Sequence, residues 1–184
     1  MLTFTTMRSP IGTLRLYAAA EQLVGVYLPG RANRDALRRH CPPEASPGCR
    51  PARSGPSRLT GVLDRAVAQL AEYFAGQRRE FSLGLALRGT SFQRLVWESL
   101  QRIPYGETCG YGELARALGR PAASRAVGAA NGRNPLSIIV PCHRLIGADG
   151  GLTGYAGGLA AKRWLLDLER AGKPGPDGPG RSRR

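Results

Sequence analysis

The reactive groups of this sequence gather in one short stretch around Cys142. Residues 138–140 (Ile-Ile-Val) are β-branched and apolar, which predicts a short buried strand. Pro141 cannot donate to a strand ladder and should end it, which leaves Cys142 at the break, followed by His143 and Arg144. A thiol reacts as the thiolate, and a nearby histidine or positive charge lowers its pKa. The stretch therefore predicts a nucleophilic cysteine.

The same cysteine could instead fill a core, because cysteine is among the most buried residue types. A proline before it and two basic or titratable residues after it favour catalysis. Neighbours on an extended chain point to opposite faces. His143 can therefore act on Cys142 only if the chain turns sharply or a water bridges the two.

The charge of the chain is strongly positive. Its 184 residues suffice for one ordinary domain or two small ones, and its formal net charge of +14 suggests a polyanionic partner. Of the 27 basic residues only Lys162 and Lys173 are lysines, a skew that the codon composition of the source genome could equally produce.

The placement of the charges is more informative than their sum. No acidic residue lies between Glu113 and Asp149. The interval contains only arginines as charged residues: Arg116, Arg120, Arg125, Arg133 and Arg144. It is either a solvated basic face or a phosphate-binding surface around the reactive cysteine.

The four cysteines do not form a disulfide framework, and neither a signal peptide nor a membrane-spanning run is evident, so we expect a cytoplasmic protein. His40, Cys41 and Cys49 could supply three zinc ligands, but structural zinc almost always takes four, and no fourth is evident. We predict no metal and no cofactor.

The first half of the chain reads as mixed β and α structure. Alternating apolar residues predict strands within 1–30, with a turn at residues 10–12, and a short helix is possible at 33–40. Residues 41–57 read as a loop, with a composition typical of disordered segments. A helical period covers 59–77, and residues 81–87 predict a strand.

The second half is mostly helical. Helices are predicted at 91–102, with Thr90 or Ser91 as the cap, and at 111–118 and 122–131. The last two are joined by a short turn with glycine, which is typical of a helix-turn-helix. A hairpin centred on Asp149-Gly150 precedes a glycine-rich loop around Tyr155, and the final helix, 159–170, carries Glu169 beside its apolar face.

With these motifs in place, residues 91–170 closely resemble the O6-alkylguanine-DNA alkyltransferases, also called methylated-DNA–protein-cysteine methyltransferases. The resemblance rests on an ordered set: residues 124–128 (Ser-Arg-Ala-Val-Gly), Asn134-Pro135, the Ile-Ile-Val run before residues 141–144 (Pro-Cys-His-Arg), and residues 154–158 (Gly-Tyr-Ala-Gly-Gly). Residues 1–90 resemble the family's more variable N-terminal domain, notably at residues 9–12 (Ser-Pro-Ile-Gly).

The resemblance implies an α+β fold with two domains. Residues 1–88 would form a small N-terminal α/β domain of the ribonuclease H-like type. Residues 89–171 would form a mainly helical domain with a winged helix-turn-helix, which binds DNA and accepts the alkyl group. Residues 172–184 would be a disordered basic tail.

The resemblance also implies an activity: single-turnover DNA repair, in which the alkyl group of O6-alkylguanine, and of O4-alkylthymine, moves to Cys142. His143 would activate the thiol through a water, and Glu169 would orient His143, the nucleophile–base–orienter arrangement of catalytic triads. Tyr111 would contact the flipped nucleotide and help protonate the leaving base. Asn134 would shape the turn ahead of the active strand.

The remaining implied roles concern DNA and the base. Arg125 would enter the base stack and fill the space that the guanine leaves. The predicted DNA-binding residues are Arg125, Ser124, Ala126, Arg133 and Arg144. The predicted substrate pocket consists of Val140, Pro141, Leu145, Tyr155 and Ala156, with backbone groups at Cys142, Leu145 and Ala156 reading the guanine edge. Some relatives have serine in place of Ala156.

The expected partner is double-stranded DNA containing alkylated guanine, bound by a monomer with no membrane and no obligate protein partner. The main alternative is a non-catalytic binder of alkylated DNA that recruits other repair proteins. A helix-turn-helix regulator would need a dimer interface, and no coiled-coil segment is visible. A cysteine hydrolase would need an oxyanion site and turnover.

Overall fold

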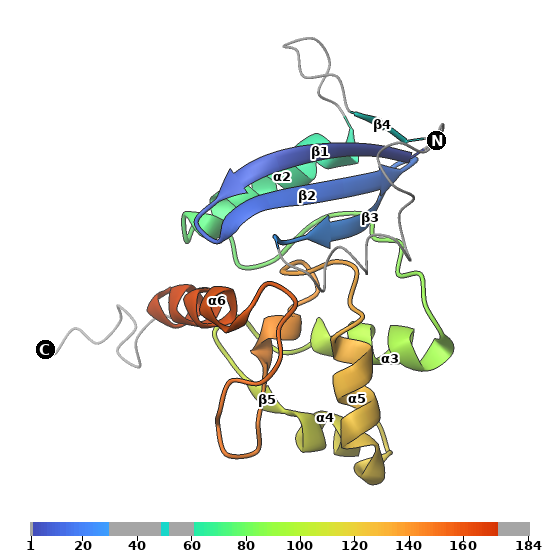
Figure 1. Ribbon diagram of the computed structural model, residues 1–184, viewed down its shortest axis with the longest axis vertical. Helices are drawn as coiled ribbons and strands as arrows, with labels where there is room; N and C mark the ends of the chain where they lie inside the picture. The colour runs from blue at the N-terminus through green and yellow to red at the C-terminus, as the bar shows by residue number, and fades with distance from the viewer. Residues whose placement is uncertain (1, 30–48, 52–60, 173–184) are drawn as a thin grey trace, which may run out of the picture.

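The N-terminal half is built on an antiparallel meander of β1 (Leu2–Ser9), β2 (Gly12–Ala19) and β3 (Gln22–Tyr27). The computed structural model describes residues 2–29, 49–51 and 61–172. A short strand, β4 (Cys49–Pro51), pairs in parallel with β1, which gives the sheet order β3-β2-β1-β4 (Figure 1). The strands predicted within residues 1–30 are confirmed.

One helix, α2 (Val62–Phe74), covers a face of this sheet (Figure 1). Its buried side chains recur at helical spacing, with Leu63, Leu70 and Tyr73 turned inward. They join Leu14 and Leu16 of the sheet in the main core. Burying each such leucine contributes roughly 1.5–3 kcal/mol, so this amphipathic stripe holds the helix on the sheet.

The C-terminal half contains three short helices: α3 (Ser91–Leu100), α4 (Tyr111–Ala117) and α5 (Ser124–Asn131). Thr90 caps α3, because its hydroxyl accepts from the Gln93 backbone while the Gln93 side chain accepts from the Thr90 backbone. A 3₁₀ turn, η1 (Pro121–Ala123), leads into α5, and Gly119 makes the preceding turn with a φ of +69°. The predicted helix-turn-helix pattern is present.

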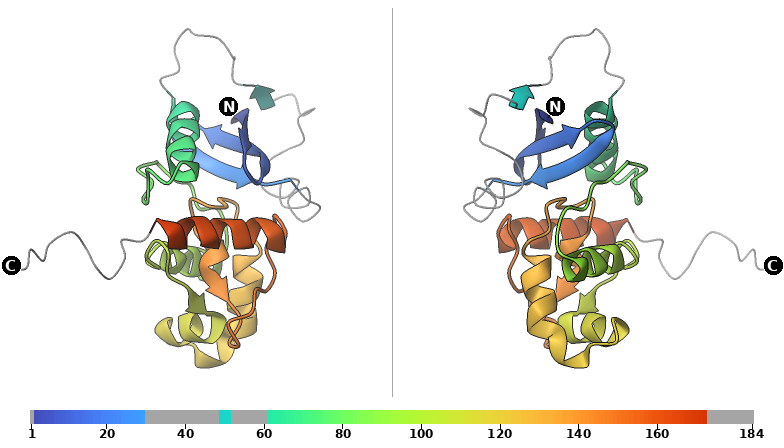
Figure 2. Two further views of the ribbon diagram at one scale, coloured as in Figure 1. Left: turned by 90° about the vertical axis from the view of Figure 1, so that its left-hand side faces the viewer. Right: turned by 90° about the vertical axis from the view of Figure 1, so that its right-hand side faces the viewer.

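The last helix, α6 (Leu159–Ala171), lies between the two halves in both views of Figure 2. Trp164 of α6 packs on Phe74 of α2, with ring centroids 5.8 Å apart. The carboxylate of Glu169 is completely buried at this junction. Because α6 touches both halves, a side chain from the N-terminal half can reach it.

The edge strand β3 also connects the halves through the backbone. The Val26 N–H donates to Pro135 O at 2.8 Å, and the Ser137 N–H donates to Val26 O at 3.2 Å. Leu23 is held in the same way by residues 84 and 86. The predicted strand at 81–87 is therefore an extended segment that forms a single bridge with the described residues, between Leu23 and Leu85.

Two predictions about the reactive stretch are wrong. Residues 138–140 do not form a strand but a buried turn, in which the Val140 N–H donates to Leu136 O at 2.8 Å and Ile138 has a φ of 74°. Residues 138–140 are buried because the turn lies inside the protein, and not because they belong to a sheet. The expected hairpin is only a turn at residues 147–151, because β6 (Leu145–Ile146) pairs in parallel with β5 (Cys109–Gly110).

Several predictions lie outside the described residues: the helix at 33–40, most of the 41–57 loop, the possible zinc ligands His40 and Cys41, and the tail after residue 172. Within the described ranges no group of three or more His, Cys, Asp and Glu side chains could hold a metal ion. Among the described helices, none has the length and apolarity needed to cross a membrane.

Candidate active site and nucleic-acid interface

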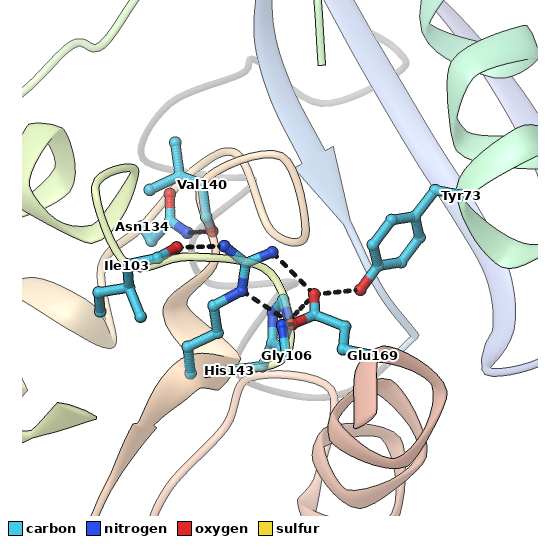
Figure 3. Close-up of polar contacts among 8 residues, drawn as sticks. Tyr73, Ile103, Gly106, Asn134, Val140, His143 and Glu169 are labelled. Atoms are coloured by element: carbon cyan, nitrogen blue, oxygen red, sulfur yellow. Dashed lines mark hydrogen bonds and ion pairs between the residues drawn. The ribbon is translucent and has the colours of Figure 1, made fainter. Parts of the chain in front are cut away.

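Cys142 sits at the start of a 3₁₀ turn, η2 (Cys142–Arg144), directly after the buried turn. Asn134 holds that turn on both sides. Its amide donates to Val140 O at 2.8 Å (Figure 3). Its carbonyl accepts from the Leu136 N–H at 3.0 Å. The asparagine therefore fixes the backbone that presents the thiol. Cys142 itself is almost fully buried.

Because Cys142 and His143 lie in a 3₁₀ turn and not on an extended chain, their side chains need not point to opposite faces. About three residues per turn separates successive side chains by roughly a third of a rotation, instead of placing them on opposite faces. His143 is completely buried, and its Nε2 lies 2.9 Å from Oε1 of Glu169. Its Nδ1 is also buried and has no hydrogen-bond partner within the described part of the chain.

The carboxylate of Glu169 is the centre of a buried hydrogen-bond network (Figure 3). Its Oε1 contacts Tyr73 Oη at 2.7 Å, His143 Nε2 at 2.9 Å and Arg144 Nη2 at 2.9 Å. Its Oε2 accepts from Arg144 Nε at 2.9 Å and from the Gly106 N–H at 3.0 Å. Burial raises the pKa of Glu169, but the bonds from His143 and Arg144 outweigh burial and hold it well below the usual range.

An ionised carboxylate accepts hydrogen bonds only, which fixes the tautomer of the histidine. The Nε2 of His143 must carry the proton that faces Glu169, so Nδ1 is the free acceptor. Burial lowers the pKa of His143, although Glu169 opposes this effect. The imidazole is therefore neutral at neutral pH and available as a base.

The thiol of Cys142 is protonated in the resting protein. Burial raises its pKa, while a hydrogen bond from Asn134 and the charge of Lys162 lower it. Lys162 is completely buried on α6, and its Nζ donates to the backbone carbonyls of Leu145 and Thr153. A buried ammonium of this kind favours negative charge on sulfur when the proton leaves.

A pocket of about 570 Å³ opens beside the thiol, which is a normal size for a site that binds a small organic group. Its lining combines the reactive turn, the helix-turn-helix and the glycine-rich loop: Tyr111, Ser124, Arg125, Gly128, Asn131, Gly132, Asn134, Ser137, Cys142, Thr153, Gly154, Tyr155 and Ala156. The Thr153 hydroxyl donates to Tyr111 Oη at 3.2 Å, which ties the loop to α4.

Small residues let α5 approach its neighbours closely. Ala130 O accepts from the indole of Trp97 at 2.9 Å, and a Cβ on Gly128 would lie 3.7 Å from the ring of Tyr111. Arg125 projects from this helix, is exposed and lines the pocket. The other exposed arginines of the acid-free interval are Arg116, Arg120 and Arg133.

Both halves of the chain match models of one family. Residues 2–87 match the ribonuclease-like domain, and residues 91–171 the DNA-binding domain, of 6-O-methylguanine DNA methyltransferase. The chain belongs to the 6-O-methylguanine DNA methyltransferase family. Its predicted family, its α+β fold class and its class as an enzyme are confirmed.

The mycobacterial relative and solved structure match nearly the whole chain, and a bacillar relative matches more than half of it. The methylated-DNA–protein-cysteine methyltransferase of Mycolicibacterium paratuberculosis is 45% identical over 174 residues, which cover 95% of this chain and 96% of the relative. The constitutive enzyme of Bacillus subtilis is 56% identical over 112 residues, 60% of this chain and 68% of the relative. The Mycobacterium tuberculosis O6-methylguanine methyltransferase has a TM-score of 0.78 at 44% identity, covering 95% of this chain and 96% of that one.

A structure of the Mycobacterium tuberculosis protein in complex with DNA has a TM-score of 0.76 at 44% identity and covers 94% and 96% of the two chains. DNA binding by this family member is therefore supported, and its predicted function in DNA repair by direct alkyl transfer to a cysteine is confirmed. The likeness extends across both domains.

The predicted site residues of this methyltransferase other than Arg144 fall into four groups. Cys142, Asn134, Tyr111, Ser124, Arg125, Tyr155 and Ala156 line one pocket, and His143 and Glu169 form the buried pair behind it. Ala126 and Arg133 are exposed on and just after α5. Val140, Pro141 and Leu145 are buried and are not among the residues that line the pocket.

The prediction that Arg144 binds DNA is wrong. Its side chain is only 8% exposed, donates to Glu169 twice and donates to Ile103 O. A buried guanidinium needs a carboxylate partner, and Glu169 supplies one. The acid-free interval therefore supplies four exposed arginines and not five.

Sequence reasoning missed two functional neighbours, Lys162 and Tyr73. Lys162 could have been noticed, because it precedes Glu169 by two helical turns on an apolar face and is one of the rare lysines. Tyr73 reaches Glu169 from 96 positions away, and no local pattern indicates such a contact.

Proposed function

We propose that Cys142 accepts the alkyl group of O6-alkylguanine, and of O4-alkylthymine, in duplex DNA, once per protein molecule. One observation carries the proposal: the thiol lines a pocket of base-compatible size, and the adjacent His143 is held by a buried carboxylate. That arrangement matches the nucleophile–base–orienter logic of activated cysteines.

The reaction exchanges one bond for another at the alkyl carbon. A sulfur–carbon bond forms as the carbon–oxygen bond breaks, and the electron pair of the broken bond stays on the purine. The thiol proton passes to Nδ1 of His143 through a water. The base takes up a proton from Tyr111 as it leaves, which restores the ordinary guanine. The thioether is stable, so the protein does not turn over.

The carboxylate of Glu169 makes this proton transfer possible. It holds His143 in the tautomer with Nδ1 unprotonated, and its charge stabilises the imidazolium that forms. Asn134 and Lys162 stabilise the thiolate at the same time. The thiol thus ionises in place, within a buried site, only while its base is correctly oriented.

DNA would be engaged by α4, η1 and α5. Exposed arginines on these elements suit phosphate contacts, and Arg125, at the edge of the pocket, suits insertion into the base stack. The flipped base would lie between Tyr155 and the Cys142 turn. The Ala156 N–H and the carbonyls of Cys142 and Leu145 would read its edge, since a carbonyl bonded once, as Leu145 O is to Lys162, can accept again. We propose that the protein acts as a monomer.

The test is mass spectrometry of the intact protein and its peptides after incubation with a duplex that contains one O6-methylguanine. We expect one methyl group per protein, on the peptide with Cys142. Cys142→Ser should abolish the gain and keep DNA binding, while Cys109→Ser, which changes a half-buried thiol outside the pocket, should leave it unchanged. A modified duplex that stays bound with no mass change would favour the non-catalytic binder.

A further inference from the structure

The Glu169 carboxylate is held by groups from both halves of the protein. Arg144, His143 and the Gly106 backbone belong to the C-terminal half, whereas Tyr73 lies on α2 of the ribonuclease-like domain. The Tyr73 hydroxyl donates to Oε1 at 2.7 Å, the shortest of the bonds that this carboxylate receives. It shares that oxygen with Nε2 of His143 (Figure 3).

We propose that Tyr73 is a positioning residue for alkyl transfer: its hydroxyl holds Glu169, and through it His143, so that the N-terminal domain completes the reaction centre. The inference rests on the proposed role of Cys142 and His143. It gives the N-terminal domain a chemical part in the reaction, beyond packing against the catalytic domain.

Tyr73 can affect the proton on His143 because both side chains bond to the same oxygen, Oε1 of Glu169. Each donor to Oε1 withdraws negative charge from it, so the Tyr73 bond weakens the pull of Glu169 on the His143 proton. Without the hydroxyl, the carboxylate attracts a positive imidazole more strongly. His143 would then be protonated at higher pH, and a protonated Nδ1 cannot accept the thiol proton.

Other ionisable groups surround this pair and are unchanged by the loss of one hydroxyl. They come from each element packed on it: Arg144 on η2, Tyr105 before β5, Tyr155 in the glycine-rich loop, Lys162 on α6, and Cys142 itself. Burial, followed by Glu169, raises the pKa of Tyr73 well above its ordinary value. Tyr73 therefore remains a donor across the whole assay range.

A packing role for the ring is the alternative. Tyr73 is completely buried, and its ring contacts Phe74, Phe81 and Tyr105. Tyr73→Phe preserves these contacts and removes only the hydroxyl. Tyr17→Phe is the matched control, because Tyr17 is equally buried in the same domain but belongs to the separate cluster with Val24 and Tyr27.

The experiment measures single-turnover methyl transfer to Cys142 from pH 5 to 9, in full-length protein, with DNA affinity measured in parallel. We expect Tyr73→Phe to lower the rate about tenfold, the lower end of the loss seen when a metal-bound histidine loses the outer hydrogen bond that orients it. Its acid limb should move to higher pH, while DNA affinity and the Tyr17→Phe rates stay at the wild-type level.

Replacing Tyr73 with 3-fluorotyrosine provides a second test that preserves the ring and the bond. Its more acidic hydroxyl donates more strongly, so the acid limb should move to lower pH. An unmoved acid limb in both proteins, or a loss that is equal at every pH and matched by Tyr17→Phe, would overturn the inference. If wild-type protein gains no methyl on Cys142, the proposed function itself fails, and the two failures are thus distinguishable.

Discussion

Two arginines from one acid-free interval occupy opposite environments. Arg144 is buried against Glu169, and its three nitrogens all donate to protein oxygens. Arg125 is exposed at the rim of the pocket. A charge removed from water needs a partner within the protein, whereas an exposed charge can bind a phosphate. The buried network and the exposed helix-turn-helix should therefore respond to different measurements.

The largest expected effect comes from the buried side. Glu169→Gln keeps the shape of the side chain but removes the charge that balances Arg144. We expect a loss of about 3–5 kcal/mol in the free energy of unfolding, as for a broken buried ion pair. Methyl transfer should slow on the order of 10⁴-fold, as when a triad carboxylate becomes an amide. Urea unfolding and single-turnover kinetics measure the two losses.

Asp167→Asn is the matched control on the same helix. The Asp167 side chain is 62% exposed and lies 3.8 Å from Arg170, so its loss should change stability by less than about 0.5 kcal/mol. Similar losses in the two variants would mean that burial does not distinguish the two carboxylates.

Replacing each arginine in turn should separate the effects of the buried network from those of the exposed helix-turn-helix. Arg144→Met should destabilise the protein by about 3–5 kcal/mol, since it leaves the Glu169 carboxylate without its cation, while the salt dependence of DNA binding stays unchanged.

Arg125→Ala should leave the free energy of unfolding unchanged and slow repair of duplex DNA by more than about tenfold, because flipping a base costs a few kcal/mol.

Free O6-methylguanine and Arg133→Ala are the controls for Arg125. The free base needs no flipping, so Arg125→Ala should react with it at nearly the wild-type rate. Arg133 is exposed and lies outside the pocket, so Arg133→Ala should lower the salt slope of binding by about 1 and spare the flipping step. Equal slowing of Arg125→Ala on duplex and free base would contradict the role in flipping.

The buried network also predicts how stability depends on pH. The pKa of His143 is lowered by folding, so the unfolded chain binds more protons and stability falls as the pH drops below about 6.5. The pKa of Glu169 is lowered too, so a second loss begins below about 4.3. Urea unfolding at a series of pH values measures both. Glu169→Gln should remove the second loss, and a second loss that persists there would assign it to other carboxylates.

Local patterns predicted the helices and their ends well. The Thr90 cap, the spacing of α6 and the small residues of α5 all depend on residues that are close together in the sequence. Local reasoning also predicted Cys142 as the nucleophile, whereas the resemblance supplied the pairing of His143 with Glu169, which lie 2.9 Å apart. The errors concern residues whose environment depends on distant partners. The turn at 138–140 depends on Asn134 and β3, and the partners of Arg144 come from α6 and the loop after α3.

The smallest expected effects lie on the exposed side, where two glycines of the helix-turn-helix should respond in opposite directions. Gly128 is inside α5, and its added Cβ would meet the Tyr111 ring at an ordinary contact distance of 3.7 Å. Gly128→Ala should therefore stabilise the protein by about 0.5–1 kcal/mol, because alanine loses less backbone entropy. Gly119 has a φ of +69°, so Gly119→Ala should cost about 1–2 kcal/mol.

Urea unfolding of the two variants measures the difference, and neither change touches the Glu169 network. Gly119→Ala should retain methyl transfer to free O6-methylguanine at close to the wild-type rate, since Gly119 is not among the residues that line the pocket. Destabilisation by Gly128→Ala would show that α5 has no room for a methyl group against Tyr111. The small residues of this helix would then be needed for its close packing within the protein. Contact between this helix and DNA would be left to Arg125.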